Sequence, residues 1–204
     1  MAHYYGPKVR LSRGLEAPIA ETPKHAAMKR PKPPGQHGYR RGRVSLYGTQ
    51  LMEKQKFARY YNIRDVQLRQ YATQAQSARK PSVEVLQEIL ERRLDNVIRR
   101  LRWARTIWQA RQMVVHGHFL VNGRKVDLPS FYVKAGDIIS VKEDSKQFVR
   151  RSAESTEGMG FRVPDWLSVD QDKMEATVLH SPKAEEIMYP FEVDCSRIIE
   201  FYTR

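Results

Sequence analysis

The chain has 204 residues, which is enough for one or two modest domains, and 41% of them are hydrophobic while 29% are charged. The formal charge of +13 indicates a polyanionic partner, which is either a nucleic acid or an anionic membrane surface. The apolar runs are too short for a membrane span or a secretory signal, and the single Cys195 excludes an internal disulfide.

The positive charge is concentrated at the front of the chain. Residues 1–80 carry 17 Lys and Arg against 4 Asp and Glu, whereas residues 151–204 carry 6 against 11. Residues 1–43 contain scattered prolines and many basic side chains without a hydrophobic period, so we interpret them as a basic extended arm. Two interpretations of the arm stay open: a disordered, solvated segment, or one that becomes ordered among phosphates. The stiff, glycine-bearing string from residue 33 to residue 38, PPGQHG, favours the second.

Residues 44–90 have the pattern of a helical subdomain. Ser45 is predicted to cap a first helix that ends near Asn62, and Leu68 begins the apolar stripe of a second. The break at Pro81 precedes a further helix, which we expect to continue through Leu90 into the next segment.

Residues 91–155 are predicted to form a compact module of two helices on a small antiparallel sheet. The first helix carries an apolar stripe at spacings of three and four, formed by Leu94, Val97, Ile98 and Leu101. The second is predicted to begin at Thr106, with Gln109 at the capping-box position, and to end at Gly117.

The strands of this module are predicted from turn signals. Asn122-Gly123 separates two short apolar and basic runs and is a strong hairpin signal, and Ala135-Gly136-Asp137 precedes a closing strand at 138–141. With arginines projecting from the helices and basic residues at the turns, such a module suits a phosphate backbone.

The end of the chain is more acidic. Residues 143–160 carry no clear element, and residues 156–194 are interpreted as an acidic hairpin and loop, with strands near Val169 and Ala176. The apolar run 198–202 is expected to dock back and to complete the helical subdomain from about residue 195. The fold class that follows is α+β.

Several strings carry a resemblance to a known family. RLDNV from residue 93, HGHFLVNGRKVD from residue 116 and VKAGD from residue 133 resemble the RNA-binding module of ribosomal protein number four of the small subunit. The same module occurs in some pseudouridine synthases and tyrosyl-tRNA synthetases, so by itself it indicates structured RNA. PPGQHG, Tyr47-Gly48 and EKQK from residue 53 resemble the ribosomal family outside the module, so the resemblance covers essentially the whole chain.

This resemblance implies a structural protein that binds small-subunit ribosomal RNA early in assembly, in the cytoplasmic ribosome or that of an organelle. It also implies contact with small-subunit protein five, a contribution to translational accuracy and a position near the messenger RNA where it enters. From the family pattern and the clustered charge, the expected rRNA contacts are Arg30, Gln36, His37, Arg40, Arg41, Arg43, Lys54, Lys56, Arg93, Arg100, Arg105, Arg111, His116, His118, Asn122, Arg124, Lys125 and Lys134.

Some members of the family hold zinc through four cysteines near the amino terminus. By the resemblance, the corresponding positions here are Val9, Ser12, Ala20 and His25. None is a thiol, so the chain resembles the zinc-free form and we expect no metal or cofactor. It also departs from the family where Arg102 replaces a frequent glycine, Ala135 a frequent proline, and Thr106-Ile107 a frequent Ser-Arg pair.

The sequence contains no pattern of a catalytic site, and we expect no enzymatic activity. Gly158-Met159-Gly160 lacks the strand and helix of a phosphate loop, and Glu185 and Glu186 diverge on a helix. An enzyme that modifies RNA would need a catalytic domain of about a hundred residues, which the acidic end does not supply. Two rival functions are a chaperone-like binder of free ribosomal RNA and a membrane-surface binder, and for the latter an apolar amphipathic helix is missing.

Overall fold

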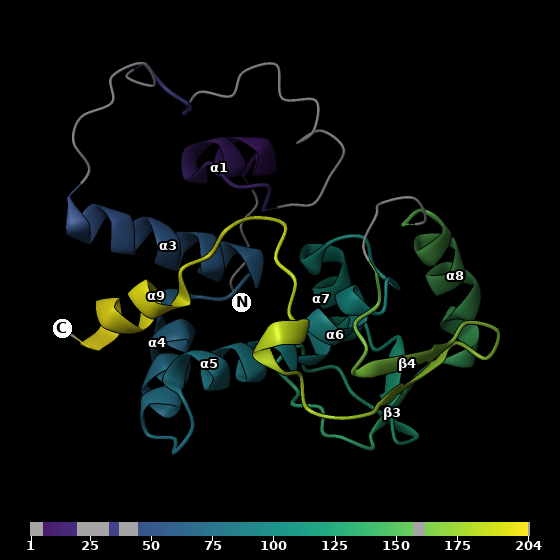
Figure 1. Cartoon of the computed structure of the whole chain (residues 1–204). Coiled ribbons are helices and arrows are strands. Elements are labelled where there is room, and N and C mark those ends of the chain that lie inside the picture. Colours follow the sequence, from purple (N-terminus) through teal and green to yellow (C-terminus); the bar gives the residue numbers. More distant parts are fainter. Residues whose placement is uncertain (1–5, 20–32, 37–44, 157–161, 204) are drawn as a thin grey trace. The chain divides into compact units, whose positions relative to one another are not determined.

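The computed structural model describes residues 6–19, 33–36, 45–156 and 162–203, and all structural statements refer to these ranges. They divide into two compact units, one within Met1–Leu86 and Tyr189–Arg204, the other Gln87–Met188 (Figure 1). Helices and one antiparallel sheet make up the described elements, so the predicted α+β class is confirmed.

The first unit is helical. Its elements are α1 (Lys8–Leu15), α3 (Leu46–Tyr60), α4 (Asp65–Gln76), the start of α5 (Ser82–Glu91) and α9 (Cys195–Thr203). Ser45 caps α3 by accepting a hydrogen bond from the Gly48 amide at 3.1 Å, and Asn62 follows the helix with a left-handed φ of 50°, as the sequence predicts. α9 packs against α3 and α4, so the carboxyl end of the chain helps to enclose the core around Phe57, Leu68 and Ile198 (Figure 1).

Helix α1 was not expected from the sequence. Pro7 stands at its N-cap and Glu16 ends it with a φ of 52°, so it is only eight residues long. A helix of this length fits between Pro7 and Pro18, and Leu15 and Ile19 are buried. The amino-terminal part of the chain is therefore not uniformly extended.

The second unit contains the predicted helices and hairpin. Its elements are α6 (Leu94–Arg100), α7 (Ile107–Val115), β1 (Phe119–Val121), β2 (Arg124–Lys125), β3 (Ile138–Val141), the short η1 (Glu143–Ser145), α8 (Lys146–Glu154), β4 (Leu167–Asp170), β5 (Glu175–Val178) and η2 (Ala184–Glu186). α7 begins after Thr106, whose hydroxyl accepts from the Gln109 amide, and it ends before Gly117. The capping box is incomplete, because the Gln109 side chain accepts from the Arg105 amide instead of that of Thr106.

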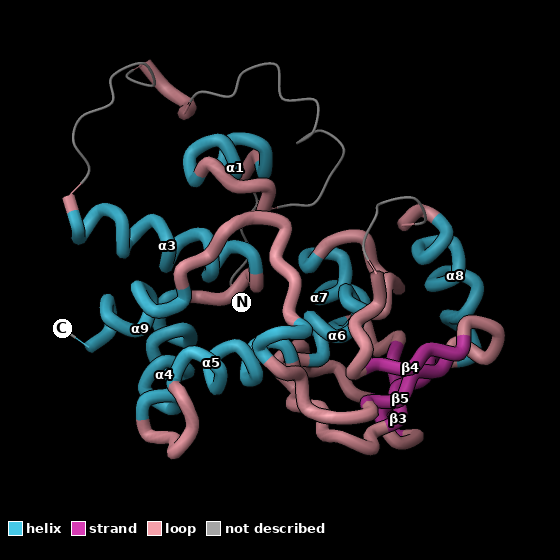
Figure 2. The backbone as a smooth tube through the Cα atoms, in the orientation of Figure 1, coloured by secondary structure: helices cyan, strands magenta, loops and turns pink. Residues whose placement is uncertain are grey.

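The sheet is larger than the sequence indicates. The hairpin β4–β5 is confirmed, but β5 also pairs antiparallel with β3, opposing Ile139 and Ala176. The strand order is therefore β2-β1-β3-β5-β4, and the acidic hairpin belongs to the same sheet as the basic one (Figure 2).

The core of this unit lies between α6, α7 and the sheet. Val97, Ala110 and Val114 from the helices meet Phe119 and Ile139 from the strands. Trp103 is buried and stacks on Phe119, with ring centroids 5.9 Å apart and planes 5° from parallel. α8, which the sequence does not predict, closes the unit through the fully buried Val149.

The expected continuous helix from Ser82 into the RLDNV string is wrong. α5 ends at Glu91, and Arg93 is extended, with φ −68° and ψ 136°, and forms a β-bridge with Tyr132. Tertiary pairing with the segment before Lys134 thus outweighs the helical propensity of two arginines.

Candidate nucleic-acid interface

The predicted contact residues of the arm fall mostly outside the described ranges. These are Arg30, His37, Arg40, Arg41 and Arg43. Gln36 is described, and its side chain is exposed at the turn that follows Gly35.

The arginines around α6 are held by carboxylates within the same unit. Arg93 is only 1% exposed and forms a bidentate ion pair with Asp95. Its Nη2 donates to Oδ2 at 2.8 Å and its Nε donates to Oδ1 at 3.1 Å. The Nη1 of Arg111 lies 3.5 Å from the same carboxylate. A fully buried charge would be costly alone, so two guanidinium groups sharing it make the arrangement tolerable.

A second carboxylate continues this arrangement. Glu91 is fully buried and accepts hydrogen bonds from Arg100 Nη2 at 2.7 Å, Arg100 Nε at 2.9 Å and Asn96 Nδ2 at 2.7 Å. Arg99 donates to the Asn96 side-chain oxygen at 2.7 Å. We refer to this group as the arginine brace: Glu91, Arg93, Asp95, Asn96, Arg99, Arg100 and Arg111.

The arginine brace adjoins a backbone clamp on the segment 129–133. The amides of Leu94 and Asp95 donate to the carbonyls of Phe131 and Pro129, at 2.9 and 3.2 Å. Arg92 donates through Nε to the Val133 carbonyl at 2.8 Å and lies over the Tyr132 ring. The clamp fixes the start of the turn that carries Lys134.

The sequence-based picture of arginines projecting from the first module helix is therefore wrong for most of them. Arg93 and Arg99 are buried, while Arg92 and Arg100 are ion-paired to Glu88 and Glu91. Contact of Arg93, Arg100 and Arg111 with RNA stays a prediction, and the structure gives these three side chains a bracing role that a pattern of basic residues did not indicate.

Four of the predicted contacts are exposed on two turns that are tied together. Asn122 donates to the Asp137 carboxylate at 2.9 Å and accepts from the Ile138 amide at 2.9 Å, while the Lys134 amide donates to Asp137 at 2.7 Å. Both Asn122 and Gly123 have positive φ, as expected of this hairpin turn. We refer to Asn122, Arg124, Lys125 and Lys134, all exposed, as the turn cluster.

Gly117 brings Lys125 of the turn cluster to the end of α7. Its φ is +73°, and a Cβ at this position would collide with the Lys125 side chain, which lies directly on it. The ammonium thus sits beside the carboxyl end of a helix, where its charge is favourable.

His118 is partly buried at the start of β1. Its Nδ1 is 2.8 Å from the Ser145 hydroxyl, and its ring centroid is 5.3 Å from that of Phe148. Burial lowers the pKa of His118, and the neighbouring His116 and Lys142 lower it further, so the ring is neutral at pH 7. Neither Ser145 nor Phe148 was foreseen, because they lie in the polar stretch where no element was predicted.

Of the remaining predicted contacts, Lys54 and Lys56 have internal partners. In the first unit, Lys54 forms an ion pair with Asp65 at 2.8 Å and lies over the Phe201 ring, and Lys56 pairs with Glu53 at 2.7 Å. The Lys54 hydrogen bond lowers the pKa of Asp65. In the second unit, Arg105 is partly buried, and no described residue accepts a hydrogen bond from its Nε.

A hollow in the first unit combines several cations. It has a volume of about 300 Å³ and is lined by Lys54, Arg59, Arg64 and Asp65 together with uncharged residues. Three positive groups against one carboxylate suit an anion better than a neutral ligand.

Arg102 has a backbone conformation that favours glycine. Its φ is 62°, the left-handed region that glycine enters without steric cost. The replacement keeps the turn between α6 and α7 at the expense of local strain.

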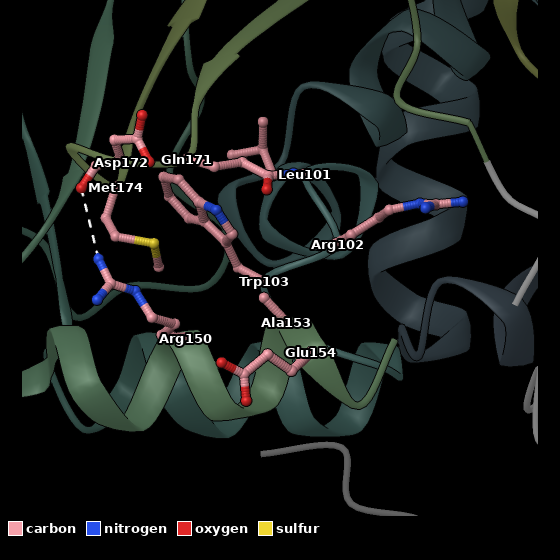
Figure 3. A pocket seen from close by; sticks show the side chains of 9 residues that line it. All are labelled: Leu101, Arg102, Trp103, Arg150, Ala153, Glu154, Gln171, Asp172 and Met174. Carbon is pink, nitrogen blue, oxygen red and sulfur yellow. Dashed lines mark hydrogen bonds between the residues drawn. The ribbon is translucent and has the colours of Figure 1, made fainter. Parts of the chain in front are cut away.

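The second unit also has a pocket of about 330 Å³ beside Trp103 (Figure 3). The buried Trp103 and Met174 form an apolar wall, Arg150 reaches the Asp172 carbonyl at 3.5 Å, and Arg102 extends away from the other lining side chains. With Glu154 also lining it, the pocket mixes both signs of charge and does not suit a polyanion.

Neither a metal site of acidic, His or Cys side chains nor a membrane-spanning helix is found among the described residues. Among them, no three His, Cys, Asp or Glu side chains are grouped so that they could hold a metal ion. None of their helices has both the length and the apolarity needed to cross a membrane.

Comparison with known proteins agrees with this geometry. A family described as "Ribosomal protein S4/S9 N-terminal domain" matches residues 3–91, and one described as "S4 domain" matches residues 92–139. The proteins called "Small ribosomal subunit protein uS4" of Acidithiobacillus ferrooxidans and Halothermothrix orenii are each 43% identical to this chain, over 212 and 210 residues. That of Geobacter sp. strain M21 is 44% identical over 211 residues, and all three matches cover 100% of both chains. The chain therefore belongs to the uS4 family of small ribosomal subunit proteins.

Proposed function

We propose that this structural constituent of the small ribosomal subunit is a primary binder of small-subunit ribosomal RNA and that it nucleates assembly of the subunit body. The observation that carries the proposal is the turn cluster. Three exposed cations, Arg124, Lys125 and Lys134, project from two turns that the Asn122–Asp137 hydrogen bond holds together. A rigid, basic surface of this kind suits the phosphate backbone of an RNA that is already folded.

We assign the proposed RNA contacts to segments of the chain according to their basic residues. The arm of residues 1–43, with Arg30, Gln36, His37, Arg40, Arg41 and Arg43, would thread among phosphates. The module of residues 91–155 would present the turn cluster, with residues 156–194 extending its sheet. Lys54 and Lys56, within residues 44–90, would add contacts from the helical part, which residues 195–204 complete.

The arginine brace enters this proposal indirectly. Arg93, Arg100 and Arg111 are bound to carboxylates, so their main contribution would be to hold the segment before Lys134 in position. Recognition would then rest on shape, phosphate and ribose contacts, because side chains cannot read the deep major groove of an RNA helix.

We further propose contact with small-subunit protein five, near the path of the messenger RNA, and through it a contribution to translational accuracy. Residues 151–204 carry 6 basic against 11 acidic side chains and would repel phosphate. This excess of acidic residues supports contact of the segment with a protein and not with RNA. Co-purification of the two isolated proteins in the absence of RNA tests this part separately.

The RNA-binding proposal is tested by footprinting the purified protein on protein-free small-subunit RNA at several salt concentrations. We expect a compact protected region, and an affinity whose logarithm drops by roughly 0.7 to 0.9 per log unit of salt for each phosphate neutralised. An affinity independent of salt, or an unprotected transcript, would contradict the proposal.

A sedimentation experiment separates a resident subunit protein from a chaperone-like binder of free ribosomal RNA. We expect the protein to stay with mature small subunits through a sucrose gradient at high salt. Release of the protein from mature subunits, with retention on free RNA, would favour the chaperone.

A further inference from the structure

A half-exposed aromatic pair lies at the end of the sheet opposite the Asn122 turn. Phe148, in the first turn of α8, is 51% exposed, whereas the next residue, Val149, is fully buried (α8 in Figure 1). The rings of Phe148 and His118 have centroids 5.3 Å apart and planes 37° from parallel. Two flat side chains thus share one patch of surface instead of entering the core.

One ring of the pair, that of His118, is held in place by its neighbours. The His118 ring is fixed by the Ser145 hydroxyl at 2.8 Å, and the His118 carbonyl accepts from the Lys142 amide at 2.9 Å. The Ser145 amide in turn donates to the Lys142 carbonyl at 2.8 Å. A ligand that stacks on His118 would therefore find this ring already ordered.

Charged side chains lie next to the two rings in the sequence, and Lys142 is near enough to His118 to lower the pKa of its ring. The side chains of Lys142 and Lys146 are 50% and 34% exposed and form ion pairs with Asp144 and Glu143. Pairs this exposed contribute little to stability and are easily exchanged for a phosphate partner. The helix itself, from Lys146 to Glu154, carries three basic residues against one acidic residue.

We propose that His118 and Phe148 form a stacking platform for one unpaired nucleobase of the small-subunit ribosomal RNA, with Lys142 and Lys146 contacting the flanking phosphates. The proposal rests on the RNA-binding function proposed above and adds a contact of a different kind. An uncharged imidazole suits this role, because it keeps its aromatic face without the hydration shell of an ion.

The chemistry of the patch favours a base over an apolar protein side chain. A hydrophobic docking site would have a contiguous apolar patch, but here one phenyl ring lies beside an imidazole, in a segment that also carries two exposed ion pairs. Bases of bulges and loops have a π-face whatever their identity, and they arrive with phosphates on both sides. This combination matches the aromatic pair and the two lysines, whose exposed partners Asp144 and Glu143 a phosphate would displace.

Filter binding of the full-length protein to small-subunit RNA, with three substitutions, tests the platform. Because base–aromatic stacking is lost with the ring, Phe148→Ala and Phe148→Leu should each weaken binding about tenfold, whereas Phe148→Trp should bind at least as well as the original. The salt dependence should be unchanged in all three, because the ring neutralises no phosphate. Since Phe148 is half exposed, the thermal unfolding temperature of each variant should differ little from that of the unaltered protein. Phe148→Leu keeps an apolar side chain without a ring, so it separates the loss of stacking from the loss of apolar packing.

The outcomes separate the platform from the underlying function. If the unaltered protein fails to bind RNA, the proposed function itself fails. If it binds and Phe148→Ala or Phe148→Leu binds equally well, the function stands and the platform is refuted, as it would be if the ring served a protein partner. Ultraviolet cross-linking of the complex should give a nucleotide adduct at Phe148 or His118, and adducts confined to other residues would also overturn the platform.

Discussion

The arginine brace and the turn cluster are both rich in cations and lie close together in the sequence, yet they are built for different tasks. In the brace, Glu91 and Asp95 are buried and take up the positive groups around them. In the turn cluster, Arg124, Lys125 and Lys134 are exposed and form no ion pair with any described residue. Whether a cation of this unit is braced or left exposed therefore depends on whether a buried carboxylate is within reach.

The largest effect is expected from removing a carboxylate of the arginine brace. Asp95→Ala removes the buried carboxylate that Arg93 and Arg111 share, so the free energy of unfolding should fall by about 3–5 kcal/mol. Urea unfolding followed by circular dichroism measures this. Asp127→Ala, at an exposed aspartate, is the matched control and should change stability by less than about 0.5 kcal/mol. If Asp95→Ala and Asp127→Ala lowered the free energy of unfolding equally, the arginine brace would have no special role in stability.

An intermediate effect is expected where the two turns are tied together. Asn122→Ala loses two side-chain hydrogen bonds and places alanine at a φ of 50°, so it should cost about 1–2 kcal/mol of stability. Asn122→Gly relieves the backbone strain but not the lost bonds, so it should be intermediate in stability while weakening RNA binding as much as alanine. An Asn122→Gly variant with unaltered affinity would mean that the tie does not position the cations.

A smaller effect on stability, but a specific one on binding, is expected within the turn cluster. Lys125→Ala should change the free energy of unfolding by less than about 0.5 kcal/mol and reduce the slope of log affinity against log salt by roughly 0.7 to 0.9. Lys173→Ala, at an exposed lysine of the acidic hairpin, should leave the slope unchanged. If both variants lowered the slope alike, binding would depend on total charge and not on the turn cluster.

The smallest effect concerns pH and His118. Because its pKa is lowered in the folded state, the unfolded chain takes up a proton first as the pH falls, and stability declines below about 6.5 until the folded form is protonated too. Chemical unfolding at pH 7.5 and at pH 5.5 should detect a modest loss. His118→Gln should lose less stability over the same interval, and an identical loss would assign the pH dependence to other groups.

Many local features of both units were predictable. The caps at Ser45 and Thr106, the stop at Gly117 and the hairpin at Asn122-Gly123 are each set by a few adjacent residues, and all are present in the structure. Helices α1 and α8 were not predicted, because neither produces a clear local signal in the sequence. Both are short, and α8 has too few apolar residues to produce a period that stands out from its polar surroundings.

The features that were not predictable depend on residues far apart in the chain. The bridge between Arg93 and Tyr132, which interrupts the expected helix, and the pairing of β3 with β5 arise only when the unit folds. The same holds for Arg111 and Asp95, whose sequence separation hides their ion pair. The number of arginines indicates a surface for RNA, but it does not show which arginines form ion pairs with buried carboxylates of the protein itself.

The position of β2 in the sheet has a consequence for the protein before it meets RNA. β2 forms one edge of the sheet, it is only two residues long, and both residues, Arg124 and Lys125, are cations. A short edge bearing like charges repels an identical edge on another molecule and offers few free amide and carbonyl groups for a foreign strand. A copy of the protein that is not bound to RNA therefore has a sheet edge that disfavours association with the same edge of another copy.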